Sequence, residues 1–525
     1  MRAIQPLLES AATAANVWIL RTSYAPTGCD AHILSVQLRN LKHLDSVLLA
    51  EITKLQKQRL AVQAQARAHS ALLAPVRRLP EELLSQIFLH AASNEGNIAY
   101  PGMEKSVHFT VVCRRWRDVA FRTAALWNRV DIKTYQPPSE ATVANRLRLT
   151  GQTPLHISYF LGRSYLLEYA GDRYTNLLSI LCEQSGRWET ARLNGVPLAV
   201  TAWTPPPFPV LRELFIEQNR DYDEDTLALS RYLHLFHHAP NLRRVTIQCL
   251  TEPPFVAFPP SWSAITHLEI DCTGSDFVGE CRFAPYIPAL ESCSHTIRSC
   301  KLRAHHMGDD LGRTHDIAFP VLEDLALASA TIGLCARIVA PLLTSVRLSM
   351  SRIISTDTPS AELADFVALL EKSAGCKKLR RVSFSALNEE PCAVVSCLRR
   401  LPSSVEELDL SDGPYFNDEV PRALVTSEVM DALTRRAGVP AHNILPNLTH
   451  LRIRHDEDVE GLHDLHDDAA GLEAVIQKLR DSRTATSVRE DGSVTAGFHS
   501  FIYDFVDLIC EGKVTGKMPK IRGRQ

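Results

Sequence analysis

The sequence predicts an α/β protein in three parts: a long N-terminal helix, a small all-helical module, and a large parallel sheet whose strands alternate with crossing helices and loops. Three observations lead to this fold class. Leucines recur every seven residues between positions 34 and 62, two short amphipathic helices lie within residues 79–130, and one apolar pattern occurs nine times between residues 211 and 453.

Length and composition limit the classes of protein to consider. A chain of 525 residues must form several structural units, because single hydrophobic cores rarely grow beyond about 300 residues. We expect boundaries at residues 1–30 (N-terminal segment), 31–72 (long helix), 73–132 (helical module), 133–456 (repeats), 457–512 (C-terminal capping region) and 513–525 (basic tail). The 57 Lys and Arg residues balance 60 Asp and Glu residues, which argues against a nucleic-acid partner.

The sequence also lacks the marks of a membrane or secreted protein. No apolar run reaches the roughly 18 residues that span a bilayer, and Glu9 interrupts the first apolar segment. The 13 cysteines are scattered without zinc-ligand spacing, so we interpret them as reduced core residues. A cytoplasmic or nuclear protein, with no membrane partner, is expected.

Residues 31–72 are predicted to form a long helix without Gly or Pro. Leu34, Leu41, Leu48, Leu55 and Val62 recur every seven residues, as in a coiled coil, and Leu38 and Ile52 occupy alternate seam positions. The other two seam positions are Asp45 and Arg59. A parallel homodimer would bury both charged residues, which is costly, so a coiled coil with a partner and a helix packed on the body of the protein both stay open. Pro75 should end this helix.

Residues 79–130 contain the two short amphipathic helices. Pro80 suits the first turn of a helix, and Glu81 and Glu82 follow where the helix dipole favours anions. The first apolar stripe consists of Leu79, Leu83, Leu84, Ile87 and Phe88, and the second of Val112, Cys113, Trp116, Val119 and Ala120. Two such helices bury little surface by themselves, so each must pack on something else.

This stretch resembles the F-box in its Leu-Pro start, its Leu-Leu-x-x-Ile-Phe segment, its Val-Cys-x-x-Trp-x-x-Val-Ala segment and its Leu-Trp end. The resemblance implies a module that binds a Skp-type adaptor and, through it, a cullin. It implies that Leu79, Pro80, Leu83, Leu84 and Ile87 contact the adaptor, and that the core contains Phe88, Cys113, Trp116, Val119 and Trp127. The connection over residues 90–108 is longer than usual in the family, and the alternative is an ordinary helical hairpin.

The repeated pattern is Leu-x-x-Leu-x-Leu, where other apolar residues replace some leucines. The copies centre on 211-214-216, 242-245-247, 265-268-270, 297-300-302, 322-325-327, 343-346-348, 379-382-384, 405-408-410 and 448-451-453, and a weaker one on 188-191-193 precedes them. In each copy the last two apolar residues alternate with polar ones, as in a half-buried strand. Short strands of this kind must pair side by side, with intervening segments such as 225–237, 361–373 and 425–437 crossing over the buried face.

This arrangement is that of an irregular leucine-rich-repeat solenoid, in which the spacing varies from 21 to 43 residues. An ordinary α/β domain with parallel strands is the alternative. Together with residues 79–130, the pattern resembles the fungal-type F-box proteins with irregular leucine-rich repeats.

Polar residues flank the two apolar positions of each copy and are predicted to form ladders on the exposed face of the sheet. The candidates for binding a protein target are Glu213, Phe215, Arg244, His267, Glu269, Lys301, Arg303, Arg347, Arg381, Asp409 and Arg452. Charges change sign along the ladders, which suits recognition of a specific protein surface. A solvated face without a ligand is the alternative interpretation of any single position.

The C-terminal part departs from the repeats. Residues 471–480 are predicted to form a helix that caps the sheet, and residues 499–510 a final short helix.

No catalytic motif is found, and no cofactor or metal site is predicted. The first hypothesis is therefore a non-enzymatic substrate receptor of a cullin-type (SCF) ubiquitin ligase, with a Skp-type adaptor and an unknown protein substrate as partners. The alternatives are an interaction scaffold without ubiquitin chemistry and an enzyme built on an α/β sheet, which the motif search disfavours.

Overall fold

A computed structural model describes residues 4–14, 21–22, 24–93, 105–133, 137–160, 167–194, 207–218, 233, 236–249, 258–259, 262–273, 282–307, 315–350, 362–412, 424–435, 443–456, 466–484, 487–488, 494–495, 498 and 500–506. The chain divides into two compact units, residues 1–120 and 121–525. This division falls before the expected boundary at residue 132. Each unit is described by itself.

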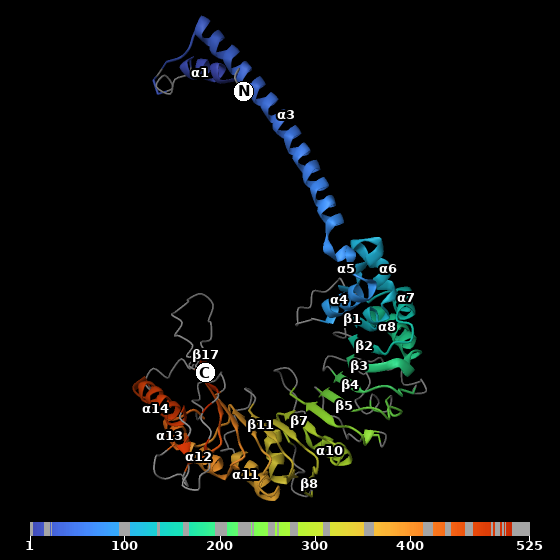
Figure 1. The fold of residues 1–525 in the computed structure, drawn as a ribbon, viewed down its shortest axis with the longest axis vertical. Coiled ribbons are helices and arrows are strands. Elements are labelled where there is room, and N and C mark those ends of the chain that lie inside the picture. The colour runs from blue at the N-terminus through green and yellow to red at the C-terminus, as the bar shows by residue number, and fades with distance from the viewer. Residues whose placement is uncertain are drawn as a thin grey trace. The chain divides into compact units, whose positions relative to one another are not determined.

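The first unit begins with two helices, α1 (Ile4–Ala14) and α3 (Gly28–Leu73). The predicted long helix is confirmed, and α1 packs against α3 (Figure 1). The helix ends before Pro75, as expected, and a short 3₁₀ turn, η1 (Pro75–Arg78), leads to the module. None of the 46 residues of α3 is buried.

The module contains α4 (Glu81–Ser93), α5 (Lys105–Val112) and α6 (Arg114–Arg122). The predicted first helix is confirmed: Pro80 precedes α4, and its carbonyl accepts the N–H of Leu84 at 3.1 Å. The predicted second helix is divided at Cys113. There the thiol Sγ accepts the N–H of Trp116 at 3.5 Å, which satisfies one of the free donors at the start of α6.

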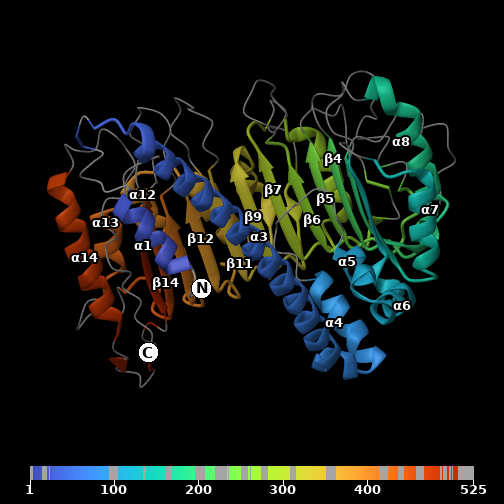
Figure 2. The same ribbon diagram turned by 90° about the horizontal axis from the view of Figure 1, so that it is seen from above.

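The second unit is built on a large parallel sheet. In the described part of the chain it has 13 strands, joined in the order in which they occur in the sequence (Figure 2). They are β1 (Arg129–Lys133), β2 (Leu155–Phe160), β3 (Trp188–Asn194), β4 (Glu213–Gln218), β5 (Arg244–Cys249), β6 (His267–Asp271), β7 (Ser299–Ala304), β9 (Asp324–Ser329), β11 (Ser345–Ser349), β12 (Arg381–Ser385), β13 (Glu407–Ser411), β14 (His450–Asp456) and β17 (Ser500–Val506). The large parallel sheet expected from the sequence is therefore present.

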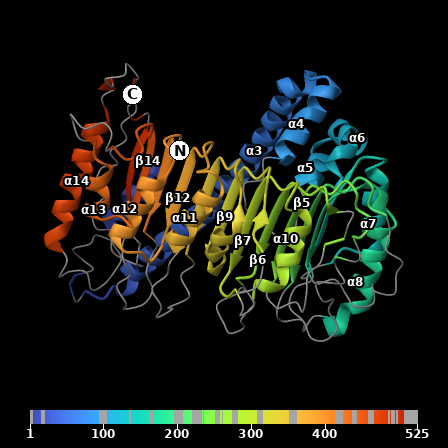
Figure 3. The ribbon, with the colours of Figure 1, turned by 90° about the horizontal axis from the view of Figure 1, so that it is seen from below.

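Helices cover one face of this sheet (Figure 3). They are α7 (Glu140–Leu149), α8 (Leu167–Cys182), α10 (Ile287–Cys293), α11 (Glu362–Lys372), α12 (Pro391–Arg400), α13 (Ser427–Leu433) and α14 (His466–Thr484). Short 3₁₀ turns are η2 (Ala124–Leu126), η4 (Ser185–Arg187), η7 (Ala284–Tyr286) and η9 (Ala330–Arg337). Two small ladders pair β8 (Ile317–Ala318) with β10 (Ile338–Val339), and β15 (Ser487–Val488) with β16 (Val494–Thr495).

Each copy of the apolar pattern supplies one strand of the sheet. Its leading residue is fully buried in all nine copies, from Leu211 to Leu448, and its last two apolar residues point into the same core. The weaker copy forms β3. Two of the expected crossing helices correspond to α11 and α13, and the third, at 225–237, lies outside the described residues except for a few positions.

The C-terminal region differs from the prediction. Residues 500–506 form β17, which pairs with β14, and not the expected final helix. The unpaired edge of β14 explains the difference, because it offers hydrogen bonds to any extended segment. The predicted helix at 471–480 is present within α14, which packs beside α13. The basic tail lies outside the described residues.

One buried charge holds α14 in place. The guanidinium of Arg483 is fully buried and donates to the carbonyl oxygens of Leu433, Leu445 and Ile444 at 2.8, 2.9 and 2.6 Å. Burial, together with the nearby Arg435, lowers the pKa of Arg483 to about 9. The sequence gives no sign of this contact, because all three acceptors are backbone atoms.

The described cysteines are free thiols, and Cys272, Cys293 and Cys300 are buried. Among the described helices, none is both long and apolar enough to cross a membrane.

Candidate docking helix and target surface

Helix α4 has one buried and one exposed apolar row. Leu84 and Phe88, four residues apart, are 0% exposed, whereas Leu83 and Ile87 are 46% and 45% exposed. Of the predicted adaptor contacts, Pro80 is also exposed and Leu79 is half-buried. Leu84 has no surface to offer a partner, so it belongs to the core of the module. We call the remaining exposed pair, Leu83 and Ile87, the docking row, because it is the candidate contact with an adaptor.

Phe88 of the buried row packs in an aromatic cluster. The ring of Phe88 stacks on Phe109 with centroids 4.4 Å apart and meets Trp116 at 4.9 Å. Val119 on α6 is buried, whereas Cys113 and Trp116 are half-buried. The sequence did not single out Phe109, whose neighbours in the chain carry no clear apolar period.

Trp127, also predicted to be a core residue of the module, belongs to the second unit. It is buried there, and its ring lies 5.6 Å from that of Phe121.

The segment that enters α4 is fixed by Arg115. Its guanidinium donates to the carbonyl oxygens of Arg77 and Leu79. These bonds tie α6 to the residues just before the docking row. A charged donor strengthens such bonds, so Arg115 holds the backbone immediately before α4 in place. Sequence reasoning missed this residue, since its partners are again backbone atoms.

An F-box-like family model matches residues 76–133. This F-box-like region begins just before the docking row and extends to the end of β1. The match supports an F-box protein. Domains of this family generally bind Skp-type adaptors, and the proteins that carry them are generally non-catalytic. A comparison with curated proteins returned no match.

Beyond the F-box-like region, the face of the sheet opposite its helices carries what we call the ladder surface: the first, third and fifth residues of β4 to β14, in register across neighbouring strands. The first row runs Glu213, Arg244, His267, Ser299, Asp324, Ser345, Arg381, Glu407 and His450. The second row runs Phe215, Thr246, Glu269, Lys301, Ala326, Arg347, Ser383, Asp409 and Arg452. All eleven predicted target contacts except Arg303, which lies in the third row, belong to these two rows.

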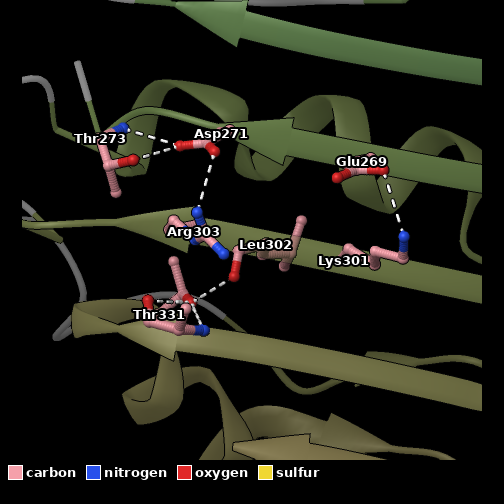
Figure 4. A network of polar contacts seen from close by, with 8 residues as sticks. Glu269, Asp271, Thr273, Lys301, Leu302, Arg303 and Thr331 are labelled. Atoms are coloured by element: carbon pink, nitrogen blue, oxygen red, sulfur yellow. Dashed lines mark hydrogen bonds and ion pairs between the residues drawn. The ribbon is translucent and has the colours of Figure 1, made fainter. Parts of the chain in front are cut away.

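Most of the charges in the first half of the ladder surface are paired with a neighbouring strand. Glu213 meets Arg244 at 2.8 Å, and Glu269 meets Lys301 at 3.4 Å. Figure 4 shows the next pair, in which Arg303 lies 3.4 Å from Asp271. The sign changes noted in the sequence thus reflect cross-strand pairs. These exposed pairs contribute little to stability, but they compete with any partner for the same charges.

Two further predicted contacts have neighbours on the sheet. Arg192 of β3 lies over the ring of Phe215, 5.0 Å from its centroid, in a cation–π arrangement. Partial burial and the nearby Arg244 lower the pKa of His267 below its usual range, so this imidazole is mainly neutral at pH 7. Phe215 and His267 are therefore better suited to apolar or neutral contacts with a partner than to binding a charged group.

The second half of the ladder surface contains a hollow of about 380 Å³. It is lined by Asp324, Ser345, Arg347, Arg381, Ser383, Glu407, Asp409, His450, Arg452, Ser500 and Ile502 together with apolar strand residues. Arg381 is engaged by Asp324 at 3.6 Å. Arg347 and Arg452 have no ion-pair partner within 4 Å among the described residues. They provide the free positive charge of the hollow.

Asp409 lies between these two arginines in the second row. One of its carboxylate oxygens is buried and has no hydrogen-bond partner among the described residues. Burial raises the pKa of Asp409, and the positive charges of Arg454, Arg452 and Arg347 oppose that rise. The hollow therefore presents two guanidinium groups and the carboxylates of Glu407 and Asp409, which can bind a charged or hydrogen-bonding group of a partner.

Strand β17 adds Ser500 and Ile502 to the rim of the hollow, although the sequence predicted a helix there. Across the described part of the chain, no group of three or more His, Cys, Asp or Glu side chains is placed to hold a metal ion.

Proposed function

We propose that this protein is the substrate receptor of a cullin-type (SCF) ubiquitin ligase, with no catalytic role of its own. In this proposal the F-box-like region binds a Skp-type adaptor through Leu79, Pro80, Leu83 and Ile87, and the adaptor links it to a cullin. One observation carries the proposal: α4 exposes two large apolar side chains, 46% and 45% accessible, within a match to an adaptor-binding family. Exposed apolar pairs at helical spacing suit a protein partner.

The parallel sheet is, in this proposal, an irregular leucine-rich-repeat solenoid of the type found in fungal F-box proteins. Strands in chain order, one for each copy of the pattern, and helices over one face support it. The ladder surface then holds the protein target. We place its main contact at the hollow, because Arg347, Arg452 and Glu407 line it without an ion-pair partner among the described residues and one carboxylate oxygen of Asp409 has no hydrogen-bond partner there. The proposed compartment is the cytoplasm or the nucleus.

Reconstitution tests the receptor assignment. Full-length protein, a Skp-type adaptor and a cullin are mixed and resolved by size-exclusion chromatography. The expected result is a three-component complex with the wild type and none with the L83D/I87D variant. The matched control is L72D, because Leu72 is also an exposed leucine, 62% accessible, but lies on α3. A complex that forms equally well with L83D/I87D, or not at all with the wild type, would refute the proposal.

The target surface is tested separately, with proteins stabilised in cells when the receptor is absent. Such a protein should bind the wild type and lose binding to the R347A/R452A variant. The control variant R244A removes an arginine that is already paired with Glu213 and should change binding less. Equal losses for both variants would move the contact away from the hollow.

A further inference from the structure

Helix α3 carries an apolar seam that nothing in the described structure covers. The seam contains Leu48, Ile52, Leu55 and Val62, which follow one another at steps of four, three and seven residues. Their side chains are 40%, 50%, 55% and 68% exposed. In water, such a seam on a helix of 46 residues calls for a partner.

The seam is exposed without interruption only in the second part of the helix, because in the first part the exposed Leu38 lies between half-buried members. Towards the N-terminus its members Leu34 and Leu41, and neighbouring Leu44, are half-buried, and α1 packs against α3. From Asp45 onward every residue up to Val62 is exposed. The free seam, residues 45–62, is 18 residues long, about 27 Å at 1.5 Å per residue.

Two charged residues within the free seam limit what can cover it. Asp45 and Arg59 occupy seam positions, and neither has an ion-pair partner in the described part of the chain. In a parallel pair of identical helices, each seam residue faces its own copy, so Asp45 would face Asp45 and Arg59 would face Arg59. Both contacts are repulsive and partly desolvated.

An antiparallel pair of identical helices removes both conflicts. The heptad has two seam positions, and in an antiparallel pair each layer joins one of them on the first helix to the other on the second helix. Ile52 can therefore face Leu55 of the second copy. In that register Leu48 faces the second copy's Arg59, and Asp45 faces the second copy's Val62. Asp45 then lies one layer from the second copy's Arg59, within reach of its long side chain. The twofold symmetry repeats this opposite-charge contact at the other end of the pair.

We propose that this protein self-associates through an antiparallel pairing of α3 with α3 of a second copy, centred between Ile52 and Leu55 and guided by two Asp45–Arg59 contacts. The inference does not depend on the ubiquitin-ligase proposal. If both hold, one assembly carries two adaptor sites and two target surfaces, which strengthens binding to targets that present two copies of the recognised segment.

The test uses sedimentation equilibrium of the full-length protein over a concentration series. A monomer–dimer equilibrium is expected for the wild type. The D45R variant places arginine beside arginine at two points, so the dimer dissociation constant should rise about tenfold. The double swap D45R/R59D restores opposite charges and should recover most of the wild-type affinity. K57E, on the outer side of α3, is the matched charge-reversal control and should have no effect.

The charge swaps also distinguish the helix orientation. In a parallel dimer D45R exchanges one repulsive contact for another and the double swap restores nothing, so that outcome contradicts the proposal. A chain that stays monomeric at all concentrations overturns it, whether α3 binds a different protein or the body of its own chain. A dimer that survives I52D/L55D forms elsewhere and overturns it as well.

Discussion

The two rows of α4 make opposite predictions for mutation. Replacing both exposed residues, as in L83A/I87A, should weaken adaptor binding and leave the fold intact. Full burial of a leucine or isoleucine side chain contributes about 1.5–3 kcal/mol. Since Leu83 and Ile87 are 46% and 45% exposed, about half of that gain remains available to a partner. The expected loss is about 2 kcal/mol for the pair, roughly a thirtyfold rise in Kd.

Replacing the buried neighbour, as in L84A, should act on stability. Leu84 is 0% exposed, and removing such a side chain typically costs about 2–5 kcal/mol of folding free energy. Binding would then fall only because the helix is less populated.

Calorimetric titration of the adaptor with full-length protein, combined with thermal unfolding of each variant, separates the two effects. The account requires unchanged unfolding with weaker binding for L83A/I87A. Binding of L83A/I87A within about threefold of the wild type would refute the assignment of the docking row.

Three further predictions concern buried polar groups of the second unit. R483M should lower stability by about 3 kcal/mol in chemical denaturation, because three buried carbonyls lose their donor. T331V should lower the free energy of unfolding by about 1–2 kcal/mol in the same measurement, because the buried Thr331 hydroxyl donates to the Leu302 carbonyl at 2.9 Å (Figure 4). The control is R380A, which removes an exposed ion pair and should change stability little. Burial and the nearby Glu389 and Asp365 raise the pKa of Glu362 from 4.5 to about 7, so its contribution to stability is full below pH 4.5 and is lost as the pH rises through 7. E362Q should therefore stabilise the protein at pH 8 by about 1–3 kcal/mol and flatten the dependence of unfolding on pH, and an unchanged profile would contradict this cause.

Apolar spacing predicted much of the fold. Period-seven leucines predicted α3, and alternation within each repeated pattern predicted ten of the strands. Strands β1, β2 and β17 were missed, β2 and β17 for physical reasons. The strand residues of β2, Leu155, Ile157 and Tyr159, alternate as expected, but no apolar residue stands three positions before Leu155, so the segment does not match the pattern. β17 is a strand because β14 offers it an edge, which is a tertiary effect.

The candidate sites were predicted less completely. The stripe on α4 was correctly located, but Leu83 and Leu84 are adjacent, about 100° apart around the helix, and only packing decides which of the two is covered. On the sheet, the alternating charges were visible, whereas the pairing of Glu269 with Lys301 depends on strand register. Repeat spacings of 21 to 43 residues leave that register open in the sequence. Arg115 and Arg483 were missed because they bind backbone carbonyls, which leave no sequence pattern.

The central claim is that α4 is the surface that meets the adaptor while the sheet stays free for a target. Hydrogen–deuterium exchange of the full-length protein, with and without a Skp-type adaptor, tests it most directly. The account predicts added protection over residues 79–93 and unchanged exchange in strands β4 to β14. Protection of the strands with none in α4, or no protection anywhere at saturating adaptor, would contradict it.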